Sequence, residues 1–149
     1  MELNKPLGYF LAKSHRIFKI AMVSRFRERE VELTFDQFVI LQILNSNSGI
    51  IQQDLANYMQ KDKSIIVRQI DGLLEKEFVI RHTNNEDKRK KNLILTEKGL
   101  VALNQMQQIG SEVTNKLLSG VSETEFEIFR NVLNRIQENG DPGEESVIC

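Results

Sequence analysis

Two short stretches with helical spacing of their apolar residues, separated by only a few residues, restrict the folds open to this chain. They cover residues 52–59 and 62–76, and the turn between them falls at Gln60 and Lys61. Two helices joined by so short a turn are typical of a helix-turn-helix. The second stretch carries its apolar residues on one side: Ile66, Ile70, Leu73 and Leu74. We expect the other side to present Ser64, Ile65, Arg68, Gln69 and Gly72.

A short hairpin is predicted directly after these helices. Residues 78–83 and 92–96 are rich in β-branched and large apolar side chains, which favour strands. The segment between them, residues 84–91, is polar throughout and ends in four consecutive bases: Lys88, Arg89, Lys90 and Lys91. The sequence therefore predicts two paired strands whose connecting tip is positively charged.

Longer helices are predicted on either side of this central part. Apolar residues recur at helical spacing through residues 7–26, 34–44, 96–118 and 122–138. Two of these helices begin with a capping box, Thr34 with Gln37 and Ser122 with Glu125. The turn-forming run 139–143 should stop the last helix and begin a flexible tail, residues 139–149. With only eight glycines and two prolines, residues 1–149 are expected to form a single, mainly α domain with one small two-stranded sheet.

Charge is segregated along the chain, although the formal net charge is −1. Residues 1–30 carry seven bases and three acids, residues 61–91 nine bases and six acids, and residues from 122 onward two bases and seven acids. The balanced total excludes a uniformly basic nucleic-acid binder and an acidic disordered chain. A basic hairpin tip alone would be a solvated loop, but directly after a helix-turn-helix it favours contact with DNA phosphates.

Other kinds of chemistry find little support in the residues. The single cysteine, Cys149, excludes a disulfide within the chain and a Cys-based metal cluster, and His15 and His82 are far apart in sequence. No phosphate-binding glycine loop or nucleophile motif occurs, so we expect no enzyme, no metal and no cofactor. The apolar runs are interrupted by charges and fall well short of the ~20 residues needed to cross a bilayer. We therefore expect a cytoplasmic protein without a signal peptide or membrane contact.

The order of these elements and three sets of residues resemble the MarR (multiple antibiotic resistance regulator) family of winged-helix transcription factors. The sets are Thr34 to Gln37 with Leu41 and Leu44; Gln52 to Ala56 with Asp62 to Ser64, Arg68, Asp71 and Leu73; and Asn85 to Arg89 with Leu93 and Leu95 to Gly99. The resemblance implies a winged helix-turn-helix lobe over residues 34–95. It also implies a homodimer whose terminal helices, residues 7–29 and 96–138, interlock. Such a dimer would read a palindromic operator in double-stranded DNA through residues 62–76.

The resemblance assigns roles to residues of the second helix and the hairpin. Arg68 would reach a guanine edge or a phosphate, and Ser64 a phosphate. Ile65 and Val67 would contact thymine methyl groups, although packing against the preceding helix is as good an explanation for Val67. Two hairpin residues match family positions, Arg89 as the wing arginine of the minor groove and Asp87 as the acid that steadies the wing. The remaining bases are assigned to phosphates or solvent: Lys63, Lys88, Lys90 and Lys91.

Three positions depart from the family pattern. Ile51 stands where a capping Ser or Thr is common, Gln60 where the turn often has glycine, and Glu77 where glycine often ends the recognition helix. Loss of a helix cap costs about 1 kcal/mol, which packing can offset. Glu77 must either avoid a left-handed conformation or accept strain.

Regulation is open on sequence grounds. Some family members bind small aromatic or lipophilic compounds between the dimer core and the lobe, and such a crevice here could be lined by Phe10, His15, Phe18, Phe35 and Phe38. Aromatic residues at helical spacing are, however, more often plain core. Some members sense oxidants through a cysteine near the first helix, which this chain lacks, and Cys149 has no second cysteine to resolve it.

Three alternative functions are compatible with these observations. The first is a homodimeric DNA-binding repressor that a small ligand would release. The second is a winged-helix protein-interaction module without DNA binding, for which a neutral or acidic recognition face would be the sign. The third and weakest is an isolated ligand carrier, which would need a large pocket and no basic face.

Overall fold

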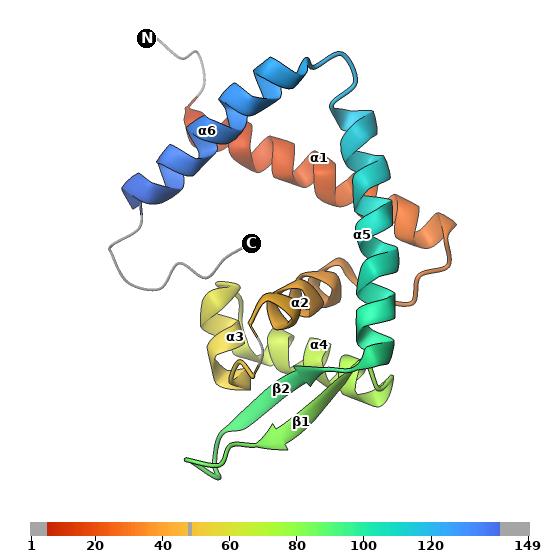
Figure 1. Cartoon of the computed structure of the whole chain (residues 1–149), viewed down its shortest axis with the longest axis vertical. Coiled ribbons are helices and arrows are strands. Elements are labelled where there is room, and N and C mark those ends of the chain that lie inside the picture. The colour runs from red at the N-terminus through yellow and green to blue at the C-terminus, as the bar shows by residue number, and fades with distance from the viewer. Residues whose placement is uncertain (1–5, 48, 141–149) are drawn as a thin grey trace.

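The structure, a computed structural model, describes residues 6–47 and 49–140. Its elements in chain order are α1 (Leu7–Glu28), α2 (Phe35–Ser46), α3 (Gln52–Tyr58), α4 (Lys63–Glu75), β1 (Val79–Thr83), β2 (Lys91–Leu95), α5 (Glu97–Leu117) and α6 (Glu123–Gly140). The predicted fold class, mainly α with a two-stranded antiparallel sheet, is confirmed (Figure 1). No helix in this described part combines the length and apolar character required to span a bilayer.

The last helix continues slightly further than predicted. Asn139 and Gly140 were expected to begin the tail, but both are helical. Proline disfavours helical backbone at the residue before it, and Pro142 lies too far on to affect Asn139. The rest of the predicted tail, residues 141–149 with Cys149, lies outside the described residues.

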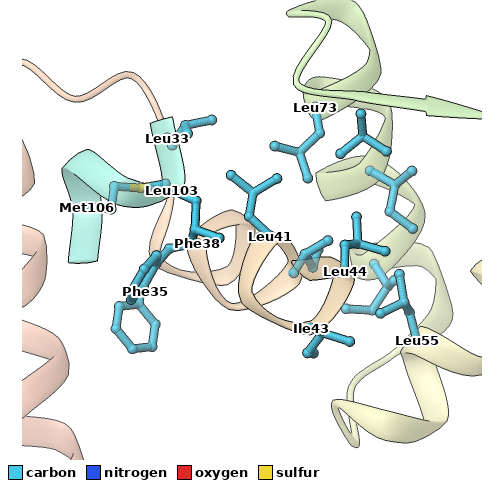
Figure 2. Close-up of a cluster of buried hydrophobic side chains, with 14 of the residues drawn as sticks. Leu33, Phe35, Phe38, Leu41, Ile43, Leu44, Leu55, Leu73, Leu103 and Met106 are labelled. Carbon is cyan, nitrogen blue, oxygen red and sulfur yellow. The ribbon is translucent and has the colours of Figure 1, made fainter. Parts of the chain in front are cut away.

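Helix α2 forms the centre of the lobe that contains α2, α3, α4 and the sheet. Its Thr34–Gln37 capping box is present: Gln37 N–H donates to Thr34 Oγ1 (3.1 Å) and Thr34 N–H to Gln37 Oε1 (3.0 Å). Figure 2 shows Leu41 and Leu44 pointing toward Leu73 and Leu55, while Phe38 points toward the side of α5. A helix with apolar residues on most of its faces is buried on most of its faces. This helix therefore holds α4 and the first turns of α5 in place.

The β1–β2 hairpin, which we call the wing, is joined to the lobe along β2. Its register pairs Val79 with Leu95 and Thr83 with Lys91. Leu93 N–H donates to Ile50 O (3.0 Å), and Ile51 forms an isolated bridge with Asn92. The segment before α3 thus acts as a short third strand at the base of the wing.

Two of the departures from the family pattern adopt a left-handed backbone. Gln60 has φ +48° in the turn between α3 and α4, and Glu77 has φ +59° after α4. Glu77 therefore accepts the strain, of about 1 kcal/mol for a non-glycine residue. Phe78 N–H donates to Leu73 O (3.0 Å), which closes the end of α4 at this bend. At the third departure, Ile51, α3 has no side-chain cap.

The terminal helices extend away from the lobe. Helix α5 packs against α1, and Nη2 of Arg29, just after α1, donates to both carboxylate oxygens of Glu112 on α5 (2.7 and 2.9 Å). Helix α6 lies at the opposite end of the molecule from the wing (Figure 1). None of its residues is buried, and its apolar residues include the exposed Phe126, Ile128, Phe129 and Val132.

Candidate nucleic-acid interface

The N-terminus of α4 is capped by Asp62. Its Oδ1 accepts from the backbone N–H of Ser64 (2.8 Å) and from the Ser64 hydroxyl (2.6 Å). Hydrogen bonding from the Ser64 hydroxyl, and then from its N–H, holds the pKa of Asp62 below its ordinary value of 3.8. Because the single hydroxyl proton of Ser64 is donated to Asp62, Ser64 can donate to a DNA phosphate only if that bond opens.

The exposed face of α4 carries most of the residues predicted to touch DNA. Ile65 is 44% exposed and Val67 37% exposed, and Lys63 and Arg68 are also exposed. Val67 is the less exposed of the two, so its partial burial agrees both with a DNA contact and with packing against the preceding helix. The opposite face is buried as predicted, through Ile66, Ile70 and Leu73.

Two residues expected on this exposed face instead join α4 to α2. The Gln69 carbonyl accepts from Gln37 Nε2 (3.2 Å), and Gln69 Oε1 accepts from the Thr34 hydroxyl (2.9 Å). A Cβ on Gly72 would lie 2.8 Å from Gln37 Nε2. The prediction was wrong for Gln69 and Gly72 because both flank the buried stripe, and the neighbouring helix covers that edge. Gln37 thus both caps α2 and positions α4.

The wing tip is shaped by side chains that bond its own backbone. Asn84 Oδ1 accepts from the N–H groups of Glu86 (2.8 Å) and Asp87 (3.0 Å). Asp87 Oδ1 accepts from Arg89 N–H (3.0 Å) and lies 3.5 Å from Arg89 Nε. The Arg89 side chain is 94% exposed, so its guanidinium stands in solvent beyond the tip.

The other wing bases are also exposed, and one of them is partly engaged. Lys88, Lys90 and Lys91 are all on the surface, but Lys91 Nζ donates to Thr83 Oγ1 across the hairpin (3.0 Å). The wing forms the end of the molecule farthest from α6, and α4 packs against β1 (Figure 1). The wing and helix α4 are therefore neighbours in the lobe.

Arg81, on β1, was not among the site residues predicted from the sequence. Its Nε donates to Gln52 Oε1 (2.9 Å) and its Nη2 to Asp71 Oδ1 (2.8 Å). It shares a strand face with the buried Val79, two residues earlier. The alternation of side chains along a strand could have identified Arg81, because it places this base on the same face as the buried Val79. A base on that face requires a partner within the lobe.

A crevice of about 460 Å³ lies between α1, α2 and the α3–α4 turn. Of the five residues predicted to line a ligand site, His15 and Phe35 border it. At its polar side, Asp36 Oδ1 lies 2.6 Å from Lys61 Nζ and 4.0 Å from Lys19 Nζ. The crevice thus touches both a terminal helix and the turn that precedes α4.

The other three predicted lining residues lie elsewhere. Phe18 and Phe38 border a neighbouring hollow on α1 and α5, and Phe38 is a core residue packed edge-on against Phe26 (5.9 Å between ring centroids). Phe10 borders neither cavity and packs against Tyr9 (5.7 Å), because it lies on the first turn of α1, beyond the lobe. Of the five aromatic residues, only His15 and Phe35 border this crevice, together with polar neighbours. Among the described residues, no group of three His, Cys, Asp or Glu could hold a metal ion.

Comparisons with known proteins agree with this geometry. The model of the MarR family matches residues 33–91, from just before α2 to the start of β2. A curated relative from Bacillus subtilis (strain 168), described as the uncharacterized HTH-type transcriptional regulator YybA, is 29% identical over 117 residues, which is 78% of each chain.

Solved structures extend the likeness to the terminal helices. The crystal structure of a MarR transcriptional regulator from Methanosarcina mazei Go1 has a TM-score of 0.80 and 28% identity, over 90% of this chain and 95% of that one. Wild-type MarR (apo form) from E. coli has a TM-score of 0.80 at 21% identity, over 91% of this chain and 98% of its own. The second likeness concerns the fold alone.

Proposed function

We propose that this chain is a DNA-binding transcriptional regulator of the MarR type, which its likeness to that family supports, and that it acts as a homodimeric repressor covering a palindromic site in double-stranded DNA. The observation that carries the proposal is an exposed face on α4 that carries Ile65 and Arg68, on a helix packed beside a wing whose tip bases are exposed. We favour a repressor because a dimer bound across a promoter blocks polymerase. Such a regulator would work in the cytoplasm, where bacterial and archaeal DNA lies.

In this proposal α4 enters the major groove. A major groove admits one helix, and Ile65 and Val67 present exposed apolar surface of the kind that contacts thymine methyl groups. Arg68 extends from the same face toward a guanine edge or a phosphate, and Lys63 toward a phosphate. Ser64 would join as a phosphate ligand when its bond to Asp62 opens.

The wing would contact the adjacent minor groove and the phosphates beside it. Arg89 is almost fully exposed at the tip, and a narrow A·T-rich minor groove attracts such a cation through its negative potential. Asp87 steadies the tip through its bond to Arg89 N–H. Lys88, Lys90 and Lys91 would neutralise phosphates, which gives affinity without reading sequence.

A second copy of the chain would cover the terminal helices. Helix α6 exposes Phe126, Ile128, Phe129 and Val132, and α1 exposes Ile17 and Ile20. Two long helices with exposed apolar faces require a partner surface. The basic residues 1–30 and the acidic residues from 122 onward are complementary in charge, which suits contact between the first helix of one copy and the last helix of the other. Two-fold symmetry would then place two α4 helices on half-sites about one helical turn, ~34 Å, apart.

The crevice offers a route for release by a small aromatic or lipophilic ligand. It lies between α1 and the lobe, and His15 and Phe35 give it aromatic walls. A ligand wedged there would change the distance between the dimer helices and α4. It would release DNA only to the extent that it binds the DNA-free arrangement more tightly.

The decisive experiment combines DNA titration with sizing of the dimer. Arg68→Ala and Arg89→Ala should weaken binding to a duplex that the wild type selects from random sequence, and each lost phosphate contact should lower the log–log salt slope by about one. Lys116→Ala, an exposed base at the far end of α5, is the matched control and should leave affinity unchanged. Unchanged affinity in both test variants would refute the assignment. If the wild type retained no mixed-sequence DNA at low salt, a protein-interaction module would be the better explanation.

A further inference from the structure

We propose that Arg81 is a positioning residue for DNA recognition: it holds the wing at the angle to α4 at which both can enter their grooves. The inference rests on the proposed DNA binding and adds a residue that touches no DNA. Arg81 is one of nine bases between residues 61 and 91, yet its side chain turns into the lobe. Its guanidinium bonds Gln52 through Nε (2.9 Å) and Asp71 through Nη2 (2.8 Å).

The place of these partners makes Arg81 a link between three elements. Gln52 is the first residue of α3, Asp71 lies in the second half of α4, and Arg81 is the middle residue of β1. One planar side chain therefore joins both helices of the helix-turn-helix to the wing. A guanidinium suits this task because its N–H groups diverge in a rigid fork.

On the tip side of this level, the wing is joined to the lobe through the bridge between Asn92 and Ile51. Val79 is buried at its base, and on the opposite strand Leu93 is buried and bonded to Ile50. Every residue of β1 after Val79 is exposed. Each strand residue advances the chain by about 3.4 Å, so the tip is a lever that extends well past Arg81. A small rotation at Arg81 therefore becomes a displacement of Arg89 at the tip.

The ion pair itself contributes little to stability. The side chains of Arg81 and Asp71 are 38% and 57% exposed, and pairs this exposed are weakened by solvent. Variants of Arg81 should therefore fold and dimerise. The variants should lower affinity for a duplex on which the wing and α4 must both fit their grooves. The charge of Arg81 should contribute little to phosphate binding, because the Asp71 carboxylate compensates it.

The test uses Arg81→Lys and Arg81→Gln in the full chain. Lysine keeps the charge but is a point donor that cannot hold Gln52 and Asp71 in the same planar arrangement. Binding is measured by fluorescence anisotropy over a range of salt, on a duplex that the wild type selects from a random pool and on a mixed-sequence duplex. We expect both variants to lose about tenfold in affinity for the selected duplex, as for the loss of one good groove contact. Affinity for the mixed duplex and the salt slope should stay at wild-type values.

A wing-tip variant provides the control. Lys88→Gln removes a phosphate contact, so it should weaken both duplexes alike and lower the salt slope by about one. If Arg81 instead touches phosphate, Arg81→Lys will bind as the wild type does and Arg81→Gln will resemble Lys88→Gln, which overturns the proposal. Equal losses on both duplexes, in line with a reduced folded fraction, would also overturn it. Failure of the wild type to bind either duplex would refute DNA binding itself, and the role of Arg81 with it.

Discussion

The junction between the lobe and α5 depends on Gly99, and its replacement by alanine should be destabilising. Gly99 lies in the first turn of α5, where its N–H donates to the capping hydroxyl of Thr96 (3.0 Å). A Cβ at this position would lie 2.1 Å from the carbonyl oxygen of Phe78 and 2.7 Å from Leu95 Cδ1. The Phe78 oxygen also accepts from Thr96 N–H (3.1 Å), so it cannot move away without loosening the helix cap.

The expected size follows from two opposing effects. Overpacking a tight site costs about 1–3 kcal/mol, and a clash with backbone belongs at the upper end of that range. Alanine is favoured over glycine in a helix by about 1 kcal/mol, which offsets part of the cost. We therefore expect Gly99→Ala to lower the free energy of unfolding by about 2 kcal/mol.

The same helix supplies the control. A Cβ on Gly110 would meet Met22 Cε at 3.7 Å and Sδ at 3.9 Å, which are ordinary contacts. Gly110→Ala should therefore be neutral or stabilise by up to about 1 kcal/mol. Both variants are measured by urea unfolding followed by circular dichroism, at one protein concentration because a dimer's stability depends on it. If Gly99→Ala is as stable as the wild type, the account of this junction is refuted.

Two further predictions concern the cap of α4 and the dimer. Hydrogen bonds from Ser64 lower the pKa of Asp62, so the stabilisation by its carboxylate is complete above 3.8 and is lost as the pH falls through the lowered pKa. In Asp62→Asn the new side chain caps the helix without titrating. Below pH 3.8 the urea midpoint of the wild type should therefore fall relative to the midpoint of this variant. A difference between the two midpoints that does not change with pH would contradict the assignment. On α6, Phe129→Glu should convert the proposed dimer to a monomer in sedimentation, whereas Asn131→Glu, which adds the same charge on the polar side of the helix, should not. If both variants are monomeric, or both are dimeric, the apolar face of α6 is not the interface.

Several features of the fold depend only on residues close together in sequence, and these were predictable. The Thr34–Gln37 capping box joins residues three apart, and the structure shows both of its bonds. The buried stripe of α4 follows from 3.6 residues per turn, and the wing follows from two β-branched runs around a polar segment. The same local signals identified the exposed bases of the wing tip and the exposed face of α4.

Contacts between elements could not be read in this way. Gln69 accepts a hydrogen bond from α2, and Gly72 leaves room for the same neighbouring side chain. Arg81 bonds Gln52 and Asp71. Position 99 must be glycine because a Cβ there would clash with the Phe78 carbonyl. Periodicity tells which residues share a face, but the packing of neighbouring elements determines which edge of that face is covered. The crevice likewise arises where α1 meets the α3–α4 turn, segments about forty residues apart, so its residues could not be selected by aromatic spacing alone. Sequence thus determined the helices, the wing and the bases that face solvent. Packing determined which polar side chains hold α4 and the wing in place, because a hydrogen bond between distant residues forms only once the fold has brought them together.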